Sequence, residues 1–275
     1  MQSNNPAFKR NEAFTRNGYA TFDVATPSAG DLEDQYGLPS RNREGAMTLE
    51  DVVTRTGMMF ALLLVTAAAT WFLIPPVVES PDGSLGLNGA LVVAWIGAAI
   101  LGFVLAMVIS FSKTIRPALI LTYAAVQGVF IGAASSFFEV LYPGIVVQAV
   151  LGTLAAFATM LVLYRFRVVR ATPKFRKVLI IAGVAFMALN LVNLVTVVLG
   201  GPSFFYDSGL LGVGLAALGV TLASLFLVLD FDFIEQGIRN RLPRPFAWSA
   251  AFGLVVTLVW LYLEMLRLIS ILRGN

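Results

Sequence analysis

The sequence contains no cysteine and no histidine. These two absences together exclude disulfide bonds, thiol nucleophiles, histidine general bases and soft-metal sites. Carboxylates are then the side chains left to titrate near neutral pH, and a metal ion would have to bind through oxygen. Charge is also scarce, since 13% of residues are charged, against roughly 25% in an ordinary soluble domain.

Apolar sequence fills most of the chain instead. Of its 275 residues, 58% are hydrophobic, and the mean hydropathy is +0.82. Runs of about 20 apolar residues, separated by breaks that hold proline or glycine, predict seven transmembrane helices. They are expected at residues 54–75, 88–110, 117–138, 143–164, 177–199, 209–230 and 248–272. We therefore expect an all-α integral membrane protein whose seven-helix domain covers residues 51–275.

Residues 1–50 differ in composition from the rest. They are rich in Asn, Ser, Gly, Pro and charged residues and show no sustained apolar periodicity, which predicts a disordered tail. No apolar core lies close behind Met1, so we expect no cleaved signal peptide and insertion directed by the first span.

Basic residues predict the direction of the spans. The tail and the loops after the second, fourth and sixth spans contain Lys and Arg, including Lys113 and Arg116, whereas the first, third and fifth loops contain none. Because short basic loops stay in the cytoplasm, we expect a multi-pass protein of the cell membrane with a cytoplasmic N-terminus. The net charge of +3 then reflects topology and lipid contact rather than nucleic-acid binding.

The seventh span carries Glu264 and Arg267 in the segment WLYLEMLRL. An ionised side chain at the bilayer centre costs roughly 2.5 to 3.5 kcal/mol, so each must be paired, neutral or in contact with water. Their spacing of three residues, with the acid first, suits an ion pair within one helix. The same face carries Trp260, Thr257 and Gly253 and is smaller and more polar than the opposite face, so we expect it to point into the bundle.

A second acid, Asp230, ends the sixth span in SLFLVLDFDFIEQGI. It shares a helix face with Gly219 and Ala223, which favours an inward orientation. Asp232 lies on a different face, so we expect it to be solvated near the interface, and it is a candidate accessory acid.

Two carboxyl groups that meet away from water do not titrate independently, and Asp230 and Glu264 could share one proton. Losing it as pH rises would leave a negative site that attracts a hard cation and parts the two helices. Simple counting places Asp230 nearer the cytoplasmic face than Glu264. Their meeting therefore requires helix tilt, or a sixth helix that continues past DFDFIEQ.

These segments resemble the Bax inhibitor-1 family. The resemblance extends from about Met47 to the C-terminus and includes FLVLDFDFI, WLYLEMLRL and TYAAVQGVFIGAASSFFEVLYPGIVVQAVLGT. Asp230 with Ile234 matches the family's Asp-x-x-x-Ile pattern, and Tyr262 with Leu263 precedes the second acid position, as in the family.

The resemblance implies a pH-sensitive calcium leak around a central seventh helix, with calcium bound transiently at Asp230 and Glu264. It implies no enzymatic activity and no cofactor other than the transported ion. The chain departs from the family in three ways: Glu264 replaces an aspartate, GIRNRLPRPFAW lengthens the connection between the acids, and no basic latch residue stands at Ser110. Arg267, Lys113 and Arg116 are the candidates for a latch or counter-charge.

Two other functions fit the sequence. Intramembrane acids also occur in proton-coupled secondary transporters, although no inverted repeat is evident. A regulatory protein that binds a protease or another membrane partner through its N-terminal tail is the second alternative. A retinal protein needs a lysine in its last span, but the final lysine is Lys177, and the Gly-x-Gly-Asp element of intramembrane aspartyl proteases is absent.

Overall fold

The computed structural model describes residues 45–79, 85–203 and 209–274. Seven helices in these ranges are long and apolar enough to cross a membrane, which confirms the predicted all-α, seven-span fold class. The elements in chain order are α3 (Leu49–Leu73), β1 (Val77–Glu79), β2 (Leu85–Leu87), α4 (Gly89–Phe111), α5 (Pro117–Leu141), α6 (Ile145–Arg165), α7 (Pro173–Val198), α8 (Leu210–Arg239) and α9 (Phe246–Gly274).

Local sequence accounts for where several helices begin. Thr48 and Asp51 form a reciprocal capping box at the start of α3, in which each side chain accepts a hydrogen bond from the other's backbone N–H. Asn88 caps α4, and Pro117 and Pro173 occupy the first turns of α5 and α7, where a missing N–H costs nothing. The breaks between apolar runs therefore also serve as helix starts.

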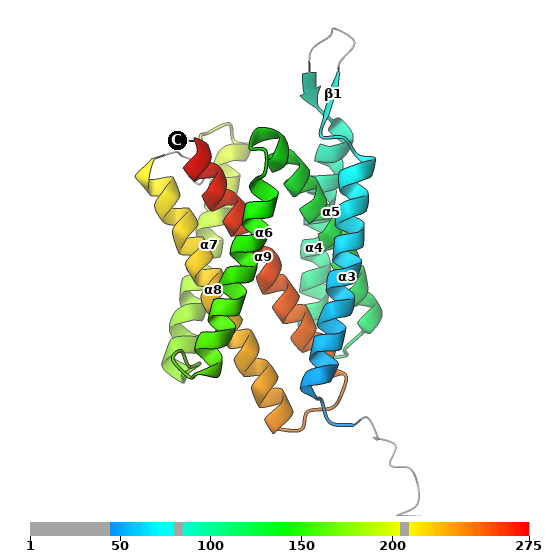
Figure 1. Cartoon of the computed structure of the whole chain (residues 1–275), viewed down its shortest axis with the longest axis vertical. Helices are drawn as coiled ribbons and strands as arrows, with labels where there is room; N and C mark the ends of the chain where they lie inside the picture. The colour runs from blue at the N-terminus through cyan, green and yellow to red at the C-terminus, as the bar shows by residue number, and fades with distance from the viewer. Residues whose placement is uncertain (1–44, 80–84, 204–208, 275) are drawn as a thin grey trace, which may run out of the picture. The chain divides into compact units, whose positions relative to one another are not determined.

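Helix α9 is the most deeply buried of the seven. It packs against α3, α5, α6 and α8, and Figure 1 shows it crossing the middle of the bundle. Helices α4 and α7 expose most of their apolar side chains, as expected for helices that face lipid. The central seventh helix implied by the family resemblance is thus present.

Close packing of α3 on α5 depends on two glycines. A Cβ atom at Gly128 would collide with the backbone carbonyl of Leu63, and one at Gly132 would collide with that of Ala67. The four-residue spacing of these glycines therefore lets two helix backbones touch, as small residues do in membrane helices.

The predicted tail, residues 1–50, ends several residues too late. Residues 1–44 lie outside the described residues. Met47, however, is buried, with 1% of its surface exposed, and its N–H donates to the carbonyl of Leu242 at 2.8 Å. Helix α3 already begins at Leu49, because the capping box and the burial of Met47 fix this segment against the α8–α9 connection.

Two further features bear on the sequence predictions. Strands β1 and β2 form an antiparallel hairpin in the first loop, where only turns were expected. Helix α8 continues through DFDFIEQ to Arg239, past the end of the predicted span at residue 230, which was one of the two alternatives for the sixth span. Its acidic residues do not end the helix, because Asp232 and Glu235 are paired with side chains of neighbouring elements.

Candidate functional site

Glu264 is held by two partners on its own helix, α9. The indole Nε1 of Trp260 donates to Glu264 Oε1 at 3.1 Å, and Arg267 Nη2 lies 2.5 Å from Glu264 Oε2. Glu264 and Arg267 are each only 6% exposed. The pair has the three-residue spacing, acid first, that favours such contacts in a helix.

Arg267 extends this contact to two other helices. Its Nη2 donates to the backbone carbonyl of Leu215 on α8 at 3.2 Å, and its guanidinium carbon lies 5.6 Å from the ring centroid of Phe186 on α7. Burying two charges is costly unless hydrogen bonds and ring contacts offset the lost hydration. The pair therefore joins α9, α8 and α7 at one level of the bundle.

Gly219 makes room for the Glu264 carboxylate. A Cβ atom at Gly219 on α8 would overlap the carboxylate and would lie 2.9 Å from the ring of Phe186. Any side chain there would have to displace the carboxylate or the ring, so α8 presents a notch into which Glu264 projects.

Asp230 lies on the same α8–α9 interface in different surroundings. Its Oδ1 would lie 3.3 Å from a Cβ atom at Gly253, and the Thr257 side chain is a neighbour of its carboxyl group. Its Oδ2 is buried and has no hydrogen-bond partner in the described part of the chain. No Lys or Arg of that part forms an ion pair with it.

The two acids do not meet, and this overturns the expected shared-proton pair. Glu264 lies opposite Gly219, and Asp230 lies opposite Gly253. Positions 219 and 230 are separated by about 16 Å along α8, at 1.5 Å per residue, and positions 253 and 264 by the same distance along α9. The continuation of α8 does not close this gap, because the turn before Phe246 sets an antiparallel register that pairs each acid with a glycine.

The remaining predicted residues form no ion pair with either acid in the described part of the chain. The side chain of Asp232 binds Arg176 Nη2 at 2.7 Å and Gln236 Nε2 at 2.6 Å. Lys113 and Arg116 are exposed in the α4–α5 connection, and neither forms an ion pair with a described residue. A latch role for Lys113 and Arg116 therefore stays a prediction.

The number of possible metal ligands near the two acids limits how calcium could bind there. The described ranges contain no group of three or more acidic, histidine or cysteine side chains able to hold a metal ion. Calcium takes six to eight oxygen ligands, and a single carboxylate supplies at most two of them.

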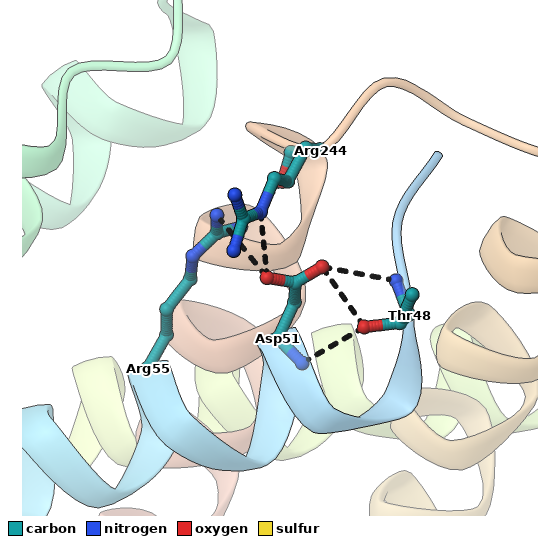
Figure 2. Close-up of polar contacts among 4 residues, drawn as sticks. All are labelled: Thr48, Asp51, Arg55 and Arg244. Atoms are coloured by element: carbon teal, nitrogen blue, oxygen red, sulfur yellow. Dashed lines mark hydrogen bonds and ion pairs between the residues drawn. The ribbon is translucent and has the colours of Figure 1, made fainter. Parts of the chain in front are cut away.

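A polar cluster at the opposite end of α9 was not predicted from the sequence (Figure 2). Arg244 Nε, in the α8–α9 connection, lies 2.7 Å from Asp51 Oδ1 at the start of α3. Arg55 lies 3.9 Å from the same oxygen and donates to the backbone carbonyl of Arg244. Asp51 also accepts from the hydroxyl of Thr48 at 2.9 Å.

Part of this cluster was readable in the sequence and part was not. The segment Thr48-Leu-Glu-Asp51 has the spacing of a capping box. Arg244 follows Asp51 by nearly 200 positions along the chain, and no local pattern indicates which acid it contacts.

Comparison with known proteins gives one family. A family model described as Bax inhibitor 1 like matches residues 5–274, nearly the whole chain. No curated protein matches the sequence significantly.

Proposed function

The chain belongs to the Bax inhibitor 1 like family of membrane proteins, and we propose that it is a pH-sensitive calcium leak of the cell membrane. In this proposal Asp230 is the proton-binding position, and Glu264 acts separately from it as the ion-paired partner of Arg267. The proposal rests on one observation: the interface between α8 and α9, inside the bundle, contains two acids.

The acids occupy different depths of this interface. Asp230 lies about 14 Å from the end of α8 at Arg239, whereas Glu264 lies about 27 Å from the start of α9 at Phe246, at 1.5 Å per residue. Both of these helix ends are on the side of the bundle that carries the basic loops. A hard cation would therefore reach Asp230 first and Glu264 later, finding a carboxylate oxygen at each position.

Apolar side chains fill the interface between the acids. Ala223 and Leu227 of α8 are fully buried in one cluster with Leu261 of α9. A cation cannot leave water to cross such a layer. The proposed path therefore opens only when α8 and α9 separate.

The two acids differ in charge compensation, which assigns them different roles. Glu264 has Arg267 beside it, so its ionised form is already balanced. Asp230 has Thr257 and Gly253 as its neighbours on α9, so an ionised Asp230 introduces an uncompensated charge that water or a cation must offset. We infer that deprotonation of Asp230 favours separation of the helices, and that Glu264 with Arg267 holds them together farther along.

Calcium flux from liposomes that contain the purified protein tests the proposal. Asp230→Asn should abolish most of the pH response of the flux. Glu264→Gln should change the flux by an amount that does not depend on whether Asp230 is also substituted. Because groups more than about 7 to 10 Å apart without shared partners act additively, the double variant should show the product of the two effects. A shared-proton pair would instead make each single variant behave like the double variant.

Glu50→Gln serves as the control, because Glu50 is an exposed acid of α3 and belongs to neither α8 nor α9. A double variant with unchanged flux and pH response would refute the proposal. Saturable uptake of a solute driven by a proton gradient would favour the transporter alternative. A partner bound through the tail is tested by deleting residues 1–44, which stops short of the structured segment at Met47.

A further inference from the structure

A cleft of about 670 Å³ opens on the outside of the bundle where α7 begins and α8 ends. Its walls include Pro173, Arg176, Lys177 and Ile180 of α7, and Gln236 of α8. Helix α7 packs on α8 and leaves most of its surface exposed. The cleft therefore faces the lipid at the level of the membrane surface, on the side that carries the basic loops.

The rim of the cleft is cationic. The segment RFRVVRATPKFRK, which joins α6 to α7, contains six basic residues and no acid. The acids that α8 brings nearby are already engaged, Asp232 by Arg176 and Glu235 by Tyr164 and Arg239. Lys177 is exposed at the cleft and forms no ion pair within the described ranges.

The wall that leads away from this rim is apolar. Ile180 and Ile181 line the cleft and are 47% and 59% exposed. They lie about one helical turn beyond Lys177, which is about 5 Å toward the membrane interior. Val184 and Met187 continue the exposed apolar surface along α7.

We propose that this cleft binds an anionic phospholipid, with its phosphate group at Arg176 and Lys177 and an acyl chain along Ile180 and Ile181. The cations lie at the membrane surface, where the anionic headgroup of such a lipid would be. The isoleucines lie below them, at the level of its acyl chain. Basic clefts between transmembrane helices on the cytoplasmic side are suited to acidic headgroups. A soluble phosphate would use only the cationic half of the cleft.

Native mass spectrometry of the full chain in micelles tests the proposal, with phosphatidylglycerol and phosphatidylcholine present in equal amounts. We expect phosphatidylglycerol to be retained preferentially. Lys177→Gln should lower its retention by about fivefold, the effect of removing one cation near an acidic lipid surface. Arg176 is a poorer choice for substitution, because its loss would also break the contact with Asp232.

Lys174→Gln is the matched control. Lys174 is an exposed lysine of α7, three residues before Lys177, and does not line the cleft, so its loss should change retention by less than about twofold. Equal effects of the two lysine variants would show diffuse surface charge and overturn the site. Equal retention of the two lipids, or displacement of the lipid by an equal concentration of glycerol phosphate, would also overturn it.

Discussion

The Glu264 carboxylate occupies the notch that Gly219 leaves on α8, so a glycine and an acid face each other across the α8–α9 interface. This contact fixes the level at which α9 presents its charge to α8. It also explains how a carboxylate and a guanidinium fit inside a bundle whose other interface residues at this level are large and apolar, such as Phe186 and Trp260.

Gly219→Ala should destabilise the protein by about 1 to 3 kcal/mol, because the added methyl group overlaps the Glu264 carboxylate. Gly214→Ala on the same helix is the control, since a Cβ atom there meets nothing within 4 Å. Both variants gain the same helix propensity, so their difference measures the clash. Thermal unfolding in detergent provides the measurement, and equal midpoints for the two variants would contradict the contact.

Arg267→Met should lower stability by about 3 to 5 kcal/mol, because it removes the cation from beside the buried Glu264 carboxylate. Adding Glu264→Gln should restore a large part of the loss, since the double variant no longer buries that charge. Arg239→Met, which breaks the exposed pair with Glu235, should cost less than about 1 kcal/mol. A double variant no more stable than Arg267→Met alone would argue against the ion pair as the cause.

Asp51→Ala should destabilise the start of α3 by about 1 to 3 kcal/mol, because Asp51 both completes the capping box and pairs with Arg244. Glu50→Ala removes an equivalent acid from the same first turn of the helix, so it controls for the helix dipole. Hydrogen exchange at the amides of residues 49–55 should rise in the first variant and hardly change in the second. At high salt, the part of the destabilisation that comes from losing the Asp51–Arg244 ion pair should be smaller.

The predicted orientation is testable because the chain lacks cysteine, so a single introduced cysteine reports its own side of the membrane. Thr114→Cys in the α4–α5 connection should resist a membrane-impermeant maleimide applied to intact cells, because basic loops remain inside. Leu87→Cys in strand β2 should react. The reverse pattern would place the N-terminus outside.

Much of the candidate site could be anticipated from the sequence. The spacing of Glu264 and Arg267 predicted a contact that depends only on helix geometry, and the structure contains it. The inward orientation of Asp230 was expected from the small residues on the same face of its helix. The meeting of Asp230 with Glu264 did not follow, because helix period says which way a side chain points and not which residue of the next helix lies opposite.

The sequence by itself determined the seven spans, the capping box at Thr48 and the Glu264–Arg267 pair, because each depends on composition or on residues within one turn of each other. The tertiary structure alone decided that Gly219 receives Glu264, that Gly253 faces Asp230 and that Arg244 reaches Asp51. Those contacts depend on the register of antiparallel helices, which is set by the turn that joins them and by packing summed over the whole interface.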